Sequence, residues 1–548
     1  MLPNRFVDGR KKADKQVASG PVIHEMKQGA KRRNKQNTDE HIGLKIFHNY
    51  HQLIFMKKRG KVFCFFVVIR KFFVQQLLDN AVYVCYPLEN QDYICGEEQT
   101  MQIISMDLSK RGGKIKPVNA VNNGPTPKPV RTTDSNFDAY AALEIPYARN
   151  HDASFCGAYG GEHTVDVHRI FKNFDADEND PASYIFEPTD EYVKLTHEAG
   201  TQTFYRLGAA IEHRYKYGVR PPKDFKKWAR ICEHIIAHYT EGWADGFHYD
   251  IEYWEIWNEP DCHHKQGDSP TWTGTMDQFC EFFETALYHL KERFPHLKIG
   301  GPAFCSLTDG REFIEHFFEY LNRNGNKAPL DFFSWHLYGN EPTEFERKIR
   351  VAKEILDKYG YGDIENHLNE WNYIKGWRNE EWKYSINAEQ SLKGASFVAG
   401  AMCVSQALPL DMLMYYDARP CVMNGIFDDN FAPRKTYYIY EMFRDLRKLG
   451  TYVPTTYRED GIYTCVATNE KEHGLMVSYF DDNDEAAPRE VCIESANPYA
   501  KTKVEYYLLD ETHNNQLARS EIFTAEKFQA YLTMTNYSTY YIKITEIK

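Results

Sequence analysis

The segment YWEIWNEPD occupies residues 253–261 and joins an apolar, aromatic run to a polar turn. We interpret residues 253–258 as a buried strand that ends at Asn258-Glu259-Pro260. Proline has no backbone N–H and cannot continue a hydrogen-bonded strand, so Pro260 marks where this strand stops. Glu259 is therefore expected at the carboxyl end of a strand.

A second segment, HLNEWN at residues 367–372, repeats this pattern, because Glu370 stands where another apolar run gives way to a loop. Around the two segments, from about residue 114 to residue 450, short apolar runs alternate with stretches of helical periodicity. This alternation is typical of a parallel α/β fold. The predicted strands span residues 117–122, 145–151, 201–208, 253–258, 298–303, 331–338, 366–371 and 412–417. The predicted helices span residues 190–199, 226–239, 277–294, 312–322, 344–359, 388–406 and 435–448, with Asp277 as the N-cap of the third.

Eight strands with intervening helices over roughly 330 residues predict an α/β fold, a (β/α)8 TIM barrel, at residues 101–450. The sequence changes after Gly450, where short β-rich runs are divided by polar turns such as DDND. Residues 451–548 are therefore predicted to form a small C-terminal antiparallel β-sandwich domain. Its strands are expected at 463–467, 475–480, 491–493, 504–509 and 540–544.

Residues 1–100 differ from the rest in charge. They hold 17 basic and 10 acidic residues, a net charge of +7, whereas the whole chain carries −12. We expect this segment to be a disordered or adventitious N-terminal extension, with translation starting near Met101 or Met106. A secretory leader and a structured accessory segment are the alternatives. The basic run KRRNK at residues 31–35 is expected to be a solvated tail.

Composition limits the partners. A net acidic chain without a basic domain argues against nucleic acid. The apolar run at residues 62–69 is far shorter than the ~20 residues that span a bilayer, so no membrane partner is predicted. Twelve scattered cysteines without a CxxC spacing indicate reduced thiols and a cytoplasmic protein, with secretion as the alternative. A homo-oligomer is left open.

Active sites of such barrels lie at the carboxyl ends of the strands. Carboxyl groups on the fourth and seventh strands would face each other across the mouth. Glycoside hydrolysis needs one carboxyl group to protonate the leaving oxygen and one carboxylate to attack the sugar or to activate water. Carboxyl groups ~5–5.5 Å apart predict retention of configuration, and ~6.5–9.5 Å predicts inversion.

The motifs WNEPD and HLNEWN, together with SWHLY at residues 334–338, resemble clan A glycoside hydrolases and, within the clan, family 39. That is the β-xylosidase and α-L-iduronidase family. The resemblance covers about residues 117–450, and the trailing β domain also fits it. The segment ARNHD at residues 148–152 follows the family's usual Arg-x-His only loosely, so the resemblance defines the sugar less firmly than the reaction.

The resemblance implies roles for individual residues. Glu259 would be the general acid and then the general base, with a pKa raised toward ~6–7 by a neighbouring carboxylate and an apolar wall. Glu370 would be the nucleophile, and Asn258 would bind the sugar 2-hydroxyl. The further candidates for substrate binding are His336, Tyr338, Arg149, His151, Asp152, Trp371 and Trp257, the two tryptophans as stacking faces.

Each candidate has a structural alternative. Glu255 is expected to be a solvated or supporting group, His336 would otherwise be a core histidine, and Arg149 and Arg206 would otherwise form ion pairs under the rim. The possible metal ligands Asp261-Cys262-His263-His264 lie in one loop. No second group of ligands follows at a spacing typical of a zinc site, so no metal and no cofactor are predicted.

The function predicted from the sequence is a retaining O-glycosyl hydrolase, an exo-acting β-xylosidase on short oligosaccharides. An α-L-iduronidase-like or arabinosidase specificity is the first alternative. A non-catalytic carbohydrate-binding barrel, or a transglycosylase using the same ester intermediate, is the other. The predicted partner is an oligosaccharide or glycoside substrate.

Overall fold

The computed structural model describes residues 42–46, 51–58, 61–68, 101–128, 134–152, 163–455, 461–469 and 471–548. The chain divides into two compact units, residues 1–97 and 98–548. Within the first unit, β1 (Ile42–Ile46), β2 (His51–Lys58) and β3 (Lys61–Val68) form an antiparallel sheet in that order. The other residues of the predicted extension, including KRRNK, lie outside the described residues, so its nature and the start site stay predictions.

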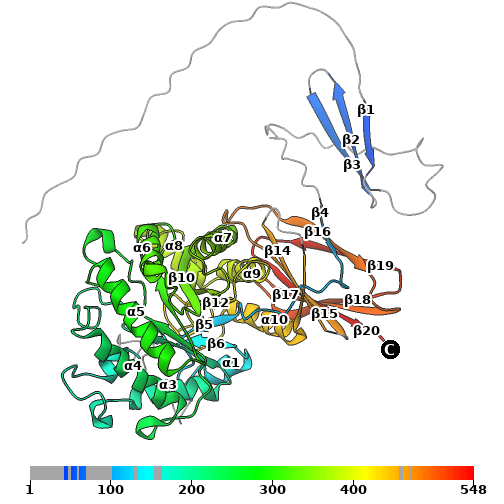
Figure 1. Ribbon diagram of the computed structural model, residues 1–548. Coiled ribbons are helices and arrows are strands. Elements are labelled where there is room, and N and C mark those ends of the chain that lie inside the picture. The colour runs from blue at the N-terminus through cyan, green and yellow to red at the C-terminus, as the bar shows by residue number, and fades with distance from the viewer. Residues whose placement is uncertain are drawn as a thin grey trace, which may run out of the picture. The chain divides into compact units, whose positions relative to one another are not determined.

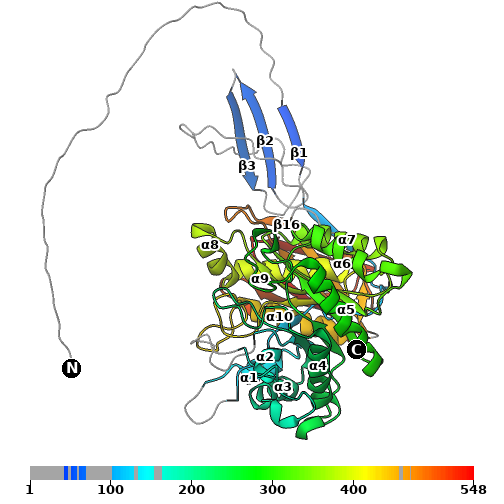
Figure 2. The same cartoon turned by 60° about the vertical axis from the view of Figure 1, so that its left-hand side comes forward.

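Eight parallel strands of the second unit close into a barrel in the order β10-β11-β12-β5-β6-β7-β8-β9, which confirms the predicted TIM barrel (Figures 1 and 2). These strands are β5 (Ala120–Asn122), β6 (Tyr147–Arg149), β7 (Gln202–Leu207), β8 (Tyr253–Ile256), β9 (Lys298–Phe304), β10 (Phe332–Gly339), β11 (Glu365–Tyr373) and β12 (Met412–Tyr415). Each overlaps one of the predicted strands. Glu259 follows the fourth barrel strand and Glu370 lies in the seventh, as predicted.

Helices surround the barrel. In α4 the apolar residues at helical spacing are buried: Trp228, Ile231, Ile235, Ile236 and Tyr239. The helices are α1 (Phe137–Ala142), α2 (Val167–Ile170), α3 (Glu187–Glu198), α4 (Phe225–Thr240), α5 (Met276–Arg293), α6 (Arg311–Leu321), α7 (Pro342–Lys358), α8 (Asn379–Glu389), α9 (Leu392–Gln406) and α10 (Lys435–Leu449). No helix of the described residues is both long and apolar enough to cross a membrane.

Two helix predictions need correction. The N-cap of α5 is Thr275 and not Asp277, because Thr275 and Gln278 form a reciprocal capping box. The helix expected at residues 388–406 begins too early, because residues 388 and 389 end α8 and the Ser391 side chain, which accepts a hydrogen bond from the Lys393 N–H, starts α9.

The β domain consists of a six-stranded sheet, β13-β14-β15-β20-β17-β18, and a three-stranded sheet, β19-β16-β4. Its strands are β4 (Gln102–Met106), β13 (Thr451–Val453), β14 (Ile462–Thr468), β15 (Glu472–Tyr479), β16 (Arg489–Ala496), β17 (Thr502–Leu509), β18 (Asn514–Phe523), β19 (Lys527–Met534) and β20 (Thr539–Glu546). A buried apolar cluster that includes Ile104, Val477, Ile493 and Ile542 fills the space between the sheets. The predicted β-sandwich is therefore present.

The predicted boundary at residue 101 assigned too much chain to the barrel. β4 precedes the barrel but pairs in parallel with β16, from Val491 with Gln102 to Ser495 with Met106 (Figure 1). The sandwich thus takes one strand from the chain before the barrel and eight from the chain after it. β18 and β19 were not predicted. β18 is largely exposed, whereas β19 alternates between exposed and buried positions, so for β19 a strand signal was available.

The six-stranded sheet packs against the barrel through β14 and β15, which contact α9 and α10. Lys393, which is 4% exposed on α9, makes a polar connection at this contact. Its Nζ lies 2.9 Å from Asp482 Oδ1 and 3.0 Å from Asp484 Oδ1. Because a buried ammonium needs charged partners, this cluster ties the barrel to the β domain.

Candidate active site

The backbone beyond β8 directs Glu259 into the barrel mouth. The Trp257 N–H donates to the Leu207 carbonyl at 2.7 Å, and the Glu259 N–H donates to the Ala303 carbonyl at 2.9 Å. These bonds hold the end of β8 between its two neighbouring strands. Glu259 has a φ of 49°, a left-handed conformation that a glutamate adopts only at a cost. Such strain is typical of functional positions.

Glu370 reaches the mouth at an irregularity in β11. Trp335 of β10 is opposite Leu368, and His336 is opposite Glu370, so Asn369 has no opposing residue. An extra residue of this kind interrupts the alternation of side chains along a strand. Asn369 donates to Glu255 at 2.5 Å, and Glu370 contacts Arg149. The consecutive residues Asn369 and Glu370 therefore both take part in the site.

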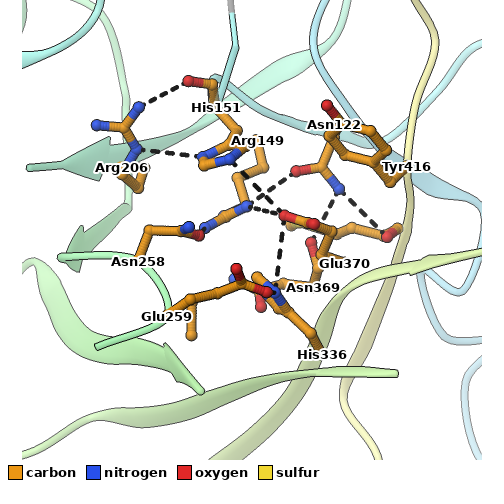
Figure 3. A network of polar contacts seen from close by, with 12 residues as sticks. Asn122, Arg149, His151, Arg206, Asn258, Glu259, His336, Asn369, Glu370 and Tyr416 are labelled. Carbon is orange, nitrogen blue, oxygen red and sulfur yellow. Dashed lines mark hydrogen bonds and ion pairs between the residues drawn. The ribbon is translucent and has the colours of Figure 1, made fainter. Parts of the chain in front are cut away.

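The two glutamates meet at His336 (Figure 3). Glu259 Oε1 lies 2.7 Å from His336 Nδ1, and Glu370 Oε2 lies 3.7 Å from the same nitrogen. A carboxyl oxygen of each glutamate and a ring nitrogen of His336 lie within 4.8 Å of one another. The carboxyl groups are thus close enough to act on one sugar carbon.

Arg149 occupies the floor of the site and is fully buried. Its Nε donates to Glu255 at 2.7 Å, Nη1 to Glu370 at 3.1 Å and Nη2 to Asn258 at 2.6 Å. The prediction that Arg149 recognises a sugar hydroxyl is wrong, because the guanidinium is covered and its donors are engaged. The structural alternative, an ion pair under the rim, is correct.

Four side chains line the mouth of the barrel around Glu370: Tyr338, His151, Asp152 and Tyr416. The Tyr338 hydroxyl donates to Glu370 Oε1 at 2.7 Å, and His151 Nε2 lies 3.9 Å from Glu370 Oε2. Asp152 accepts a hydrogen bond from the Tyr416 hydroxyl, and its Oδ1 lies 3.5 Å from His151 Nε2. The structure thus brings the predicted residues His151, Asp152 and Tyr338 to the nucleophile candidate.

Burial shifts the protonation equilibria of the central groups. It raises the pKa of Glu259 to about 7 and lowers the pKa of His336 to about 4. Burial also raises the pKa of Glu370, although His336, Arg149 and the Tyr338 hydroxyl act to lower it. His336 is therefore a neutral imidazole at neutral pH, and Glu259 is the carboxyl group best suited to carry a proton.

Asn258 offers an unused donor beside the carboxyl pair. Its Oδ1 accepts from Arg149, whereas its Nδ2 is buried and has no hydrogen-bond partner among the described residues. A buried amide without a partner is costly unless a ligand or water completes it. Asn258 is therefore suited to bind a sugar hydroxyl, the role that the family resemblance implies for it.

The predicted stacking role of Trp257 and Trp371 is wrong. Trp257 is 1% exposed and packs against Trp228, Trp272 and Phe282, and Trp371 is fully buried against Phe345 and Tyr415. Both side chains lie in the hydrophobic core, so neither ring has a face open to a sugar. A different tryptophan, Trp377, is 55% exposed, and its ring contacts Tyr338.

The supporting residues Asn122, Ser334 and Tyr416 were not predicted, whereas Arg206 was considered for an ion pair, which it forms with Asp166. Ser334 donates to Glu255 at 2.6 Å. Asn122 accepts from Arg149 at 3.1 Å, and Arg206 donates to His151 Nδ1 at 3.3 Å (Figure 3). Asn122 ends the first barrel strand and Tyr416 directly follows the eighth, so the carboxyl-end rule was the available signal for both. Glu255 is fully buried and supports Arg149, which agrees with the supporting role considered for it and not with a solvated cap.

Two groups of described side chains have ligand atoms close enough to approach one metal ion, Glu259 with His336 and Glu370, and Glu259 with Cys262 and Cys305. In the first group the spacing follows from hydrogen bonding between Glu259 and His336. Cys262 belongs to the loop in which a metal site was considered and rejected, whereas His263 and His264 of that loop take no part in either group.

A (β/α)8 barrel with paired carboxyl groups at the ends of its fourth and seventh strands has the architecture of the clan A glycoside hydrolases. Residues 155–399 match the model of glycosyl hydrolases family 39. The motifs WNEPD and HLNEWN lie inside this range. The chain therefore resembles family 39 within that clan, as its sequence predicts.

Two relatives agree with this resemblance, and a solved structure shares the fold. The chain is 30% identical over 295 residues to a β-xylosidase of Geobacillus stearothermophilus, covering 48% of this chain and 56% of that protein. It is 26% identical over 173 residues to a β-xylosidase of Caldicellulosiruptor saccharolyticus, covering 30% of this chain and 32% of that protein. The matches thus span about half and a third of these relatives. A crystal structure of a glucosidase from Croceicoccus marinus has the same fold, with a TM-score of 0.65, 20% identity, and coverage of 82% of this chain and 100% of that one.

Proposed function

We propose that the chain is a retaining glycoside hydrolase and an exo-acting β-xylosidase. The carrying observation is that carboxyl oxygens of Glu259 and Glu370 lie within 4.8 Å of each other. This separation suits a double displacement, because an inverting enzyme must hold a water molecule between carboxyl groups ~6.5–9.5 Å apart.

In the proposed mechanism Glu370 attacks the anomeric carbon while Glu259 gives its proton to the leaving glycosidic oxygen. Before the reaction, the protonated carboxyl group of Glu259 donates its hydrogen bond to Nδ1 of neutral His336. Glu370 is held for attack by the Arg149 guanidinium and the Tyr338 hydroxyl. Glu259, now a carboxylate, takes a proton from the water that hydrolyses the glycosyl ester on Glu370.

A neutral pentose is the sugar best supported. The names of two relatives, both β-xylosidases, point to xylose. A uronide would need an unpaired cation for its carboxylate. The described arginines around the site are each paired with an acid, Arg149 with Glu255, Arg206 with Asp166 and Arg419 with Asp417. These pairs favour β-xyloside over an iduronide-like substrate.

The cellular compartment and the acceptor are part of the same proposal. The eight cysteines among the described residues are free thiols, which supports a reducing, cytoplasmic environment.

Water is the proposed acceptor of the glycosyl group. A sugar acceptor would make the protein a transglycosylase through the same ester, and product analysis at high sugar concentration distinguishes the two.

The test compares aryl β-xyloside, α-arabinoside and iduronide substrates, followed by azide rescue of Glu370→Ala. With β-xyloside, azide should restore turnover and form a glycosyl azide of inverted configuration, because the missing carboxylate leaves that face open. Glu365→Ala, at the opposite end of the same strand, is the matched control and should keep activity without azide. Absence of turnover on every glycoside would leave a carbohydrate-binding barrel as the better account.

A further inference from the structure

Three aromatic rings in contact with one another continue outward from the nucleophile candidate, and Trp377 is the exposed member of the three. The Tyr338 ring, whose hydroxyl donates to Glu370, meets the Trp377 ring edge-on at a centroid distance of 5.0 Å. Trp377 in turn stacks on Trp382 at 5.5 Å and 19°. Trp377 lies between β11 and α8, on a loop at the carboxyl end of the barrel, and more than half of its side chain faces solvent.

Strand order assigns the two sides of Glu370 to different parts of a substrate. From β11, the barrel continues in one direction through β12 and β5 to β6, whose ends carry Tyr416 and the pair His151 and Asp152. In the other direction it continues through β10 and β9 to β8, which leads to Glu259. Because Glu259 protonates the leaving oxygen, the leaving group lies toward β8 and β10. The sugar whose anomeric carbon Glu370 attacks lies toward β12 and β6.

Trp377 is on the leaving-group side, because its partner Tyr338 belongs to β10. Its exposure is unusual for a tryptophan that already contacts two other rings, since such rings are normally covered in a core. Sugar rings present apolar C–H faces that bind to the flat faces of exposed aromatic side chains. The rings are also linked to Tyr338, so Trp377 has a defined position relative to the carboxyl pair.

We propose that Trp377, supported from behind by Trp382, forms a subsite that stacks on the sugar of the leaving group. The inference rests on the proposed function and names its substrate class: a glycoside whose leaving group is itself a sugar, such as xylobiose. Binding energy from the ring of the leaving sugar, which does not itself react, would be used in the transition state. Trp377 is thus a specificity-determining residue and makes no contact with the reacting atoms.

The test compares two substrates that share the xylosyl group and differ in the leaving group. Xylobiose has a sugar to stack, whereas xylosyl fluoride has a single small atom. In Trp377→Ala, kcat/KM for xylobiose should fall about tenfold, and kcat/KM for xylosyl fluoride should stay within about twofold. Trp377→Phe should recover part of the loss. Tyr288→Ala, an exposed aromatic side chain on the outer helix α5, is the control and should change neither value.

Two results would overturn the subsite. Equal losses on both substrates would mean that Trp377 only positions Tyr338, and no loss on xylobiose would mean that no sugar rests on the ring. If the wild-type protein hydrolyses neither substrate, the proposed function fails, and calorimetric binding of xylobiose decides the subsite separately. Binding that is lost in Trp377→Ala would support it, and binding that is unchanged or absent in the wild type would refute it.

Discussion

Replacing Glu259 with glutamine is expected to stabilise the protein at alkaline pH while it removes the proposed acid. Glu259 is 5% exposed, and burial raises its pKa from 4.5 to about 7. The folded state therefore binds this proton more tightly than the unfolded chain does. As pH rises above 4.5, the carboxyl group ionises first in the unfolded chain, which lowers the free energy of the unfolded state. The free energy of unfolding therefore falls until the group also ionises in the folded state near pH 7.

The magnitude follows from the size of the shift. A pKa difference of about 2.5 units corresponds to about 3 kcal/mol of lost stability above pH 7, and at pH 5 the same group costs less than about 1 kcal/mol. Glutamine has the same shape and does not ionise, so it lacks this pH dependence. The stability gain of Glu259→Gln over wild type should therefore be roughly 2–3 kcal/mol larger at pH 8 than at pH 5.

Urea unfolding of both proteins at pH 5 and pH 8, followed by tryptophan fluorescence, measures this difference. Glu354→Gln, a substitution of an exposed glutamate on α7, is the control for the loss of a carboxyl group outside the site. A gap between Glu259→Gln and wild type that is the same at both pH values would refute the reasoning, because Glu259 would then titrate alike in the folded and unfolded states. The same shift predicts that wild-type kcat/KM declines as pH rises through about 7, where the acid loses its proton.

Three further substitutions test other parts of the structure. Tyr338→Phe removes the hydroxyl that donates to Glu370 and should lower kcat about 10- to 100-fold with unchanged thermal stability, measured by steady-state kinetics and calorimetry. Arg149→Met leaves Glu255 buried without its cation and should destabilise the fold by about 3–5 kcal/mol in urea unfolding, whereas Arg149→Lys should cost less. Lys393→Met removes the buried cation that joins the barrel to Asp482 and Asp484 of the β domain and should cost about 1–3 kcal/mol, measured likewise, because Asp482 keeps Lys375 as a partner and Asp484 is half-exposed. An unchanged midpoint would show that water already compensates these charges.

The barrel strands and the two glutamates could be predicted from the sequence because their signals are local. An apolar run followed by Asn-Glu-Pro marks the end of a strand wherever that strand is placed in the sheet. β4 could not be assigned in the same way. Its partner β16 lies almost 400 residues further along the chain, and five residues contain no information about a partner at that distance. The electrostatic role of Arg149 depends in the same way on Glu255, which is 106 residues away.

The error over Trp371 has a different origin, because a local signal was available. Successive side chains on a strand point to opposite faces, so a glutamate directed into the barrel places the next residue against the helices. Trp371 follows Glu370 directly and is buried in the outer core, as this rule requires. Trp377 lies beyond the end of the strand, where the alternation no longer applies, and only the folded chain brings it to Tyr338.

The proposed roles of Glu259 and Glu370 follow from the position of one buried cation, Arg149. Glu255, Glu259 and Glu370 are all buried, and three carboxylates around Arg149 would leave a net charge of −2 in a region with little water. Such a charge is too costly to persist, so at least one group must hold a proton. Arg149 contacts Glu255 and Glu370 at 2.7 and 3.1 Å, whereas Glu259 faces the neutral ring of His336. The proton therefore goes to Glu259. In the proposed mechanism, Arg149 at the end of the second strand therefore decides, by pairing with Glu370 and not with Glu259, which glutamate is the acid and which the nucleophile.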